Sequence, residues 1–165
     1  MPQLTLRDAT NEDAAAIVAI WNPIIRDTVV TFNPVLRSIA EIEEMILSRQ
    51  VAGHAFLIAQ EGSDVLGFAS YVQFRGGLGY ARCMEHTINL APAARGKGAG
   101  RALLLALERH AAALGHHVMF AAVTGTNSTS ISFHEKLGYV HVGTMPQVGW
   151  KFDQFHDLVL MQKFL

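Results

Sequence analysis

The chain has 165 residues, of which 50 % are hydrophobic and 16 % are charged, and its formal net charge is −1. This is the size of one ordinary domain with a substantial core, so we expect a single domain over residues 1–165. The balanced charge, without blocks of like sign, argues against nucleic acid as a partner, and no apolar run approaches the roughly 18 residues that cross a bilayer, which argues against a membrane.

The first third of the chain predicts a strand and two helices. Residues 4–6 alternate as in a short strand. Thr10 and Asp13, three positions apart, resemble a capping box before a first amphipathic helix, and Ser38 and Glu41 repeat the pattern before a second one. Arg49 is expected on the solvent face of this second helix.

The middle of the chain changes to the period of strands. Apolar runs over residues 55–59 and 65–72 are separated by the turn residues 61–64, which predicts an antiparallel hairpin. Residues 74–79 contain three glycines and predict an irregular loop, and residues 83–90 predict a further strand.

A glycine-rich loop over residues 95–100, Arg-Gly-Lys-Gly-Ala-Gly, precedes a predicted helix over 102–114. Such glycines let the backbone approach a ligand, and a helix start offers unpaired N–H groups to an anion. A nucleoside-triphosphate loop needs a hydroxyl residue after Lys97, and a dinucleotide loop needs a glycine at Arg101. The loop therefore predicts a different phosphate site, with a plain glycine-rich helix start as the alternative.

The last third completes a crossover and adds a helix and two strands. Residues 118–123 form a continuous apolar run, typical of a buried parallel strand, so the glycine-rich loop should lie at the carboxyl end of strand 83–90. A helix is expected over residues 128–136, followed by strands over 139–143 and 158–164. The predicted order is β-α-α-β-β-β-α-β-α-β-β, an α/β fold.

The start of the chain and its cysteine content indicate a cytoplasmic location. Met1-Pro2-Gln3 lacks the basic start and apolar segment of a secretory signal. The single cysteine, Cys83, excludes internal disulfides and fits a reducing compartment. We expect Cys83 to be a small buried residue, not a nucleophile.

Several segments resemble the GCN5-related N-acetyltransferase (GNAT) superfamily. The loop matches its pyrophosphate pattern, Gln/Arg-x-x-Gly-x-Gly/Ala. Residues 21–22, 84–87, 130–139 and 145–152 are similar to the phosphinothricin and methionine sulfoximine acetyltransferase branch. The resemblance implies a mixed sheet of about six to seven strands with about four helices, acetyl-CoA as co-substrate without a metal, a small-molecule amine as acceptor, and a homodimer.

Glu85 is the candidate general base. Strand alternation places Glu85 and Thr87 on one face and His86 on the other. A carboxylate in an apolar strand is costly without a partner or a task. The resemblance implies that Glu85 takes a proton from the substrate ammonium, directly or through water. The alternative is an ion pair with Arg75 or Arg82.

The resemblance also implies a set of groups for acetyl-CoA. The backbone of Ile88, Asn89 and Leu90 would pair with the pantetheine amides, and the Leu90 N–H would polarise the thioester oxygen. His134 would protonate the leaving thiolate, with a coenzyme A contact or a surface histidine as alternatives. Asn127 would contact the pantetheine arm or simply cap a helix. The pyrophosphate would lie on Arg95, Gly96, Lys97, Gly98, Ala99 and Gly100.

The acceptor pocket has its own candidates. Arg75 and Arg82 would bind the acid groups of an amino-acid substrate. Phe32 and Tyr80 would form its walls, and His86 would line it or be buried for structural reasons. The leading function is transfer to the α-amino group of a small amino acid such as phosphinothricin or methionine sulfoximine. The alternatives are acetylation of a peptide N-terminus and acyl-CoA binding without catalysis.

Overall fold

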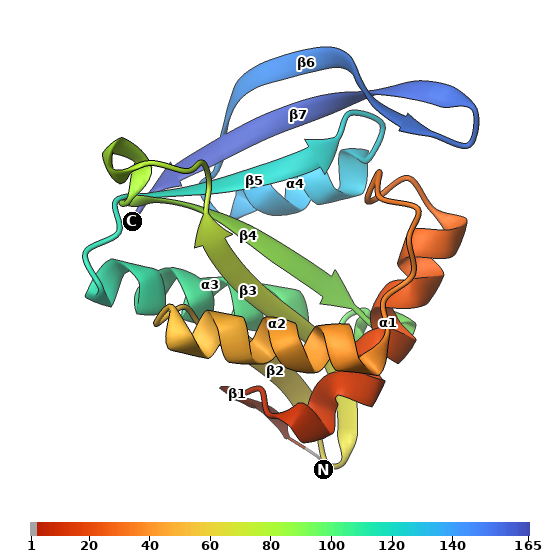
Figure 1. Ribbon diagram of the computed structural model, residues 1–165, viewed down its shortest axis with the longest axis vertical. Helices are drawn as coiled ribbons and strands as arrows, with labels where there is room; N and C mark the ends of the chain where they lie inside the picture. The colour runs from red at the N-terminus through yellow and green to blue at the C-terminus, as the bar shows by residue number, and fades with distance from the viewer. Residues whose placement is uncertain (1–2) are drawn as a thin grey trace.

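A seven-stranded sheet runs through the whole molecule, in the order β1-β2-β3-β4-β5-β7-β6 (Figure 1). The computed structural model describes residues 3–165. The strands are β1 (Leu4–Asp8), β2 (Phe56–Glu61), β3 (Asp64–Gln73), β4 (Cys83–Leu90), β5 (Val118–Thr124), β6 (Val140–Lys151) and β7 (Gln154–Phe164). Within residues 3–165, β4–β5 is the one parallel pair. The predicted mixed α/β fold and its element order are confirmed.

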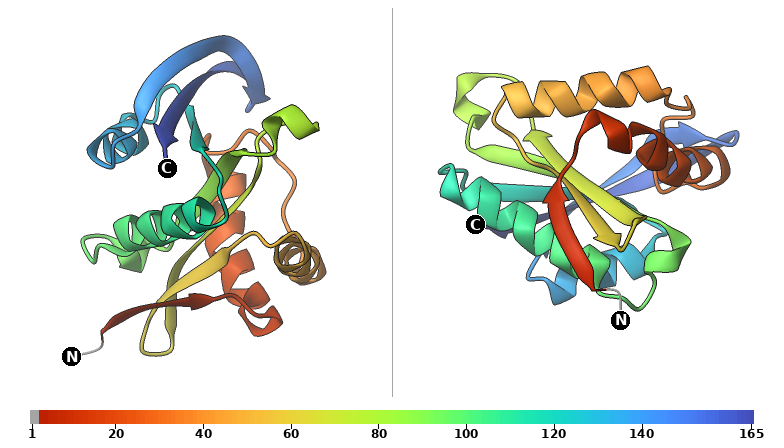
Figure 2. Two further views of the ribbon diagram at one scale, coloured as in Figure 1. Left: turned by 90° about the vertical axis from the view of Figure 1, so that its left-hand side faces the viewer. Right: turned by 90° about the horizontal axis from the view of Figure 1, so that it is seen from below.

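In the described part of the chain, four α-helices cover the two faces of this sheet (Figure 2). They are α1 (Ala14–Asp27), α2 (Ile39–Val51), α3 (Ala99–Ala113) and α4 (Ser128–Lys136). Helices α1 and α2 bury Ile17, Ile42 and Ile46 against Phe68 of β3. Helix α3 packs a second core on the opposite face. No helix within residues 3–165 is both long and apolar enough to cross a membrane.

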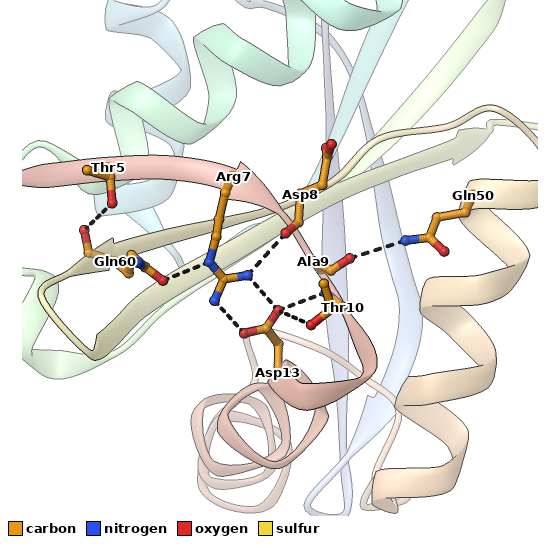
Figure 3. A network of polar contacts seen from close by, with 8 residues as sticks. All are labelled: Thr5, Arg7, Asp8, Ala9, Thr10, Asp13, Gln50 and Gln60. Carbon is orange, nitrogen blue, oxygen red and sulfur yellow. Dashed lines mark hydrogen bonds and ion pairs between the residues drawn. The ribbon is translucent and has the colours of Figure 1, made fainter.

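The start of α1 is fixed to β1 by a polar network (Figure 3). The Arg7 guanidinium donates to both carboxylate oxygens of Asp13 at 2.7 Å and to Gln60 at 2.8 Å. Asp13 also accepts a bond of 2.8 Å from the backbone N–H of Thr10, as the capping box predicts. The network therefore joins the edge of the sheet to the helix that carries Trp21.

Strands β4 and β5 separate partway along their length. Their pairing ends at Glu85, opposite Phe120, although β4 continues to Leu90. Figure 1 shows the ribbons of β4 and β5 diverging along their length. The edge of β4 beyond Glu85 is therefore open on the β5 side, and its backbone groups are free to pair with a ligand.

The predicted lengths of the last two strands are wrong. β6 and β7 extend well beyond residues 139–143 and 158–164, because a register shift between Met145 and Gly149 breaks the strand alternation that the prediction required. Within this bulge Gln147 has a φ of 55° and its N–H donates to Asp157. Helix α3 also begins earlier than predicted, at Ala99.

Candidate active site

A cavity of about 280 Å³ lies where β4 and β5 separate. Side chains from the loop after α1, from β4, and from the start and last turn of α4 converge on it. The predicted site residues in its wall are Phe32, Glu85, His86, Ile88, Asn89, Asn127 and His134. The open edge of β4 thus forms one wall of a pocket that also holds titratable groups.

Glu85 is the acidic side chain of this pocket. Burial raises the pKa of its carboxyl group above the ordinary value. Among residues 3–165 it forms no ion pair, so the alternative of a salt bridge with Arg75 or Arg82 is wrong. A half-buried, unpaired carboxylate with a raised pKa suits a general base.

His86 and His134 form a buried pair on the opposite face of β4. Their Nε2 atoms are 3.1 Å apart, and His134 Nδ1 lies 2.7 Å from the carbonyl oxygen of Ser130. A carbonyl only accepts, so the proton of neutral His134 is on Nδ1; its Nε2 then accepts from His86 Nε2–H. Burial lowers the pKa of His86 to about 3 and also lowers that of His134. Neutral His134 therefore has no proton to donate from Nε2.

Asn127 has a structural task as well as a place in the pocket wall. Its side-chain oxygen accepts a bond of 3.1 Å from the Ser130 N–H and so caps α4. No residue in the described part of the chain accepts a hydrogen bond from its amide nitrogen, which remains available to a ligand.

Lys151 fixes the loop that carries Phe32 into the pocket. Its buried ammonium donates to the carbonyl oxygens of Ile25, Thr28 and Thr31 at 2.5, 2.6 and 2.8 Å. The ring of Phe32 packs so closely on Gly149 that a side chain there would overlap it. The stretch 145–152 thus supports one wall of the site, a role that the sequence pattern did not reveal.

The glycine-rich loop is built for an anion. Gly96 and Gly98 have φ values of 75° and 74°, and Gly98 is the N-cap of α3. The first turn of α3 has no acidic side chain, and its N–H groups lie at the positive end of the helix dipole. The Lys97 ammonium is bound to Glu61, whereas Arg95 is exposed. This donor set fits a pyrophosphate.

The predicted arginines of the acceptor pocket lie elsewhere. Arg75 is exposed and stacks on Tyr80, with its guanidinium carbon 5.5 Å from the ring centroid. Arg82 is also exposed. The pocket at β4 and β5 is lined by none of Arg75, Tyr80 and Arg82, so their role in substrate binding stays a prediction.

Two other arginines, Arg37 and Arg49, line a second cavity of about 190 Å³. This cavity lies on the α1 and α2 side of the sheet and shares Trp21, Glu85 and Thr87 with the first. Arg49 is half-buried here, so its predicted place on the solvent face of α2 is wrong. The face of α2 near its end covers a cavity, and helical periodicity does not distinguish a cavity from solvent.

Cys83 and the histidines suggest no further chemistry. Burial raises the pKa of the half-buried Cys83 thiol, which disfavours the thiolate. Within residues 3–165 no three His, Cys, Asp or Glu side chains gather as metal ligands would.

Comparison with known proteins identifies the family of this chain. The model of the acetyltransferase (GNAT) family matches residues 22–139. The chain belongs to this family, which confirms the resemblance read from the sequence.

Individual relatives match nearly the whole chain. The L-methionine sulfoximine/L-methionine sulfone acetyltransferase of Pseudomonas aeruginosa is 38 % identical over 96 % of this chain and 92 % of its own length. The structure of a phosphinothricin acetyltransferase from Sinorhizobium meliloti in complex with AcCoA has a TM-score of 0.93 at 33 % identity, covering 99 % of this chain and 89 % of that one. A ribosomal-protein-alanine N-acetyltransferase from Brucella melitensis has a TM-score of 0.94 at 35 % identity, covering 98 % and 99 %.

Proposed function

We propose that the chain transfers the acetyl group of acetyl-CoA to the α-amino group of a small amino acid of the phosphinothricin, methionine sulfoximine or methionine sulfone type. The observation that carries the proposal is the open edge of β4, which leads from the anion loop to the pocket of Glu85. The acetyltransferases of Pseudomonas aeruginosa and Sinorhizobium meliloti support the choice of acceptor.

The donor site fits a long ligand with a phosphate end. The loop 95–100 lies outside the pocket wall, so a molecule that joins the two must follow Ile88, Asn89 and Leu90. Their backbone groups would hold its amides, and the Leu90 N–H would polarise its carbonyl oxygen. When bound, acetyl-CoA supplies the acetyl thioester.

Glu85 accepts the proton that the substrate ammonium must lose before the amine can react. Its raised pKa and its lack of an ion pair support this role. His134 positions the pocket through His86, and it donates a proton to the thiolate only from the imidazolium form, which burial disfavours. We therefore assign reprotonation of the thiolate to water.

Acetylation of a peptide N-terminus is the second candidate, supported by the likeness to the Brucella melitensis protein. A panel experiment separates the two. Consumption of acetyl-CoA is measured with free amino acids, including phosphinothricin and methionine sulfone, and with short peptides. We expect activity on the free amino acids, and activity on peptides alone would overturn the proposal.

A homodimer is the proposed assembly, and the hairpin of β6 and β7 is its proposed interface. β6 is the last strand of the sheet, and Val148, Trp150, Phe152 and Phe155 on this hairpin are each more than half exposed. Exposed apolar side chains on a sheet edge favour association. Light scattering should give twice the chain mass, and Trp150→Ser should shift it toward the monomer.

We also propose a cytoplasmic location, because acetyl-CoA is consumed and the single cysteine suits a reducing compartment. Cell fractionation tests it, and recovery of the protein outside the cytoplasmic fraction would contradict it.

A further inference from the structure

Two unpaired cations face the cavity of about 190 Å³ on the α1 and α2 side of β4. The Nε atoms of Arg37 and Arg49 are both buried and have no hydrogen-bond partner within residues 3–165. Neither guanidinium forms an ion pair in the described part of the chain. Buried donors without protein partners are rare in folded proteins, and here both border a cavity that a ligand could enter.

Arg37 is held in place by the Trp21-Asn22 pair of α1. The Asn22 side chain donates to the Arg37 carbonyl at 2.9 Å and accepts from its N–H at 2.8 Å. The Arg37 guanidinium carbon lies 5.4 Å from the centre of the Trp21 ring. The side chain is therefore preorganised without having its charge neutralised.

Arg49 approaches the cavity from the other end of α2. Arg37 precedes the first turn of this 13-residue helix and Arg49 lies in its last turn, so their backbones are separated by roughly 20 Å. Burial lowers the pKa of Arg49, as expected for a cation without a counterion. Two guanidinium groups that enter from opposite ends suit a ligand with two separate oxygen-bearing groups.

Glu85 is the acidic residue of the cavity wall, and it is shared with the pocket between β4 and β5. We infer that Arg37 and Arg49 bind the two oxygen-bearing ends of the acceptor, its α-carboxylate and a phosphinate, sulfone or sulfoximine group, while its amine faces Glu85. This inference rests on the proposed transfer to an amino acid. Glu85 keeps its role as the general base, and the donor site is unchanged. The specificity for the acceptor then depends on side chains of α2 and of the loop before it.

Steady-state kinetics test the inference at saturating acetyl-CoA. Arg37→Gln and Arg49→Gln should each raise the KM for phosphinothricin about 10- to 100-fold, the usual effect of losing a charge-assisted hydrogen bond. The kcat and the KM for acetyl-CoA should stay near wild type. Methionine lacks the terminal oxygens. With methionine as acceptor, the rise in KM should therefore be much smaller in at least one of the two variants. Arg109→Gln, at an exposed arginine of α3, is the matched control.

Binding is also read without turnover. Trp21 lies in the cavity wall, so the fluorescence of Trp150→Phe protein should respond to phosphinothricin, and the added Arg37→Gln change should weaken this response. If Arg49→Gln unfolds the protein, Arg49→Lys takes its place in the test. Lysine keeps the charge but lacks the planar guanidinium with its two parallel donors, so a several-fold rise in the KM for phosphinothricin is expected.

The outcomes separate this inference from the proposed function. An active wild type whose acceptor KM is unchanged in both arginine variants, or changed only in Arg75→Gln and Arg82→Gln, overturns the inference and leaves the function standing. A wild type that acetylates no amino acid overturns both.

Discussion

The two ends of the proposed site, donor and acceptor, are built from different groups. The donor end is mostly backbone: the N–H groups of the α3 start and the open edge of β4, which are contiguous in sequence from Ile88 to Gly100. The acceptor end is made of side chains from α1, α2, the loop between them and β4, supported by Lys151 of β6. Backbone sites tolerate most side-chain changes, whereas side-chain sites are retuned by single substitutions.

Glu85 lines both cavities, and its removal should have the largest effect. Glu85→Gln keeps the size of the side chain but cannot accept the proton, so turnover at neutral pH should fall roughly a hundredfold. Binding of acetyl-CoA, measured by calorimetry, should be unchanged. Glu135→Gln, on the exposed face of α4, is the control. Unchanged turnover would remove Glu85 as the base, and weakened donor binding would place it at the donor end.

The pH profile of the wild type gives a second test of Glu85. Its folded-state pKa is raised by burial, so the basic form is lost as the pH falls through that value. The kcat/KM for the amine should therefore decline on acidification at a higher pH than an ordinary carboxylate would dictate. A profile that is flat down to the ordinary range of glutamate would contradict this.

Lys151→Met should damage the acceptor end alone. It leaves one carbonyl group in the last turn of α1 and two in the following loop without their donor, so we expect a loss of about 2–3 kcal/mol in the free energy of unfolding. Because the loop carries Phe32, the KM for the amine should rise while that for acetyl-CoA stays constant. Urea unfolding and kinetics measure both, with Lys136→Met as control. A rise in the KM for acetyl-CoA would show that the two ends are coupled.

Gly98→Val should damage the donor end alone. The φ of 74° at this N-cap disfavours a β-branched residue, so the loop must distort at the start of α3. The KM for acetyl-CoA should rise about tenfold, equivalent to about 1.4 kcal/mol. Gly143→Ala, at an open position with ordinary φ, is the control. If the KM for the amine rose instead, the loop would not be the donor site.

The contrast between backbone features and side-chain features also explains which parts of the structure could be predicted from the sequence. Both capping boxes and the glycine-rich start of α3 are confirmed, because local spacing alone determines such backbone features, whereas the phosphate bound at this loop stays a prediction. The pairing of Ile88, Asn89 and Leu90 with a ligand, which needs an open edge of β4, was implied only by the family resemblance, since pairing between distant strands leaves no local pattern. Arg37 and Arg49 were missed because each is an isolated arginine whose surroundings depend on how α2 packs on the sheet.

The Arg7–Asp13 network should have the smallest effect, and on stability rather than on either end of the site. Hydrogen bonding to Arg7 lowers the pKa of Asp13 below its unfolded value, so its contribution to stability is present at neutral pH and is lost as the pH falls through the folded pKa. Because the Arg7 side chain is 39 % exposed, water screens the pair and we expect only about 1 kcal/mol. The difference in unfolding free energy between wild type and Asp13→Asn should therefore shrink below about pH 4, near the unfolded pKa of aspartate. Glu12→Gln, beside it in sequence, controls for the change in net charge. If the difference in unfolding free energy persists at low pH, Asp13 acts through packing and the Thr10 cap. If the KM for the amine changes, the start of α1 sets the position of Trp21.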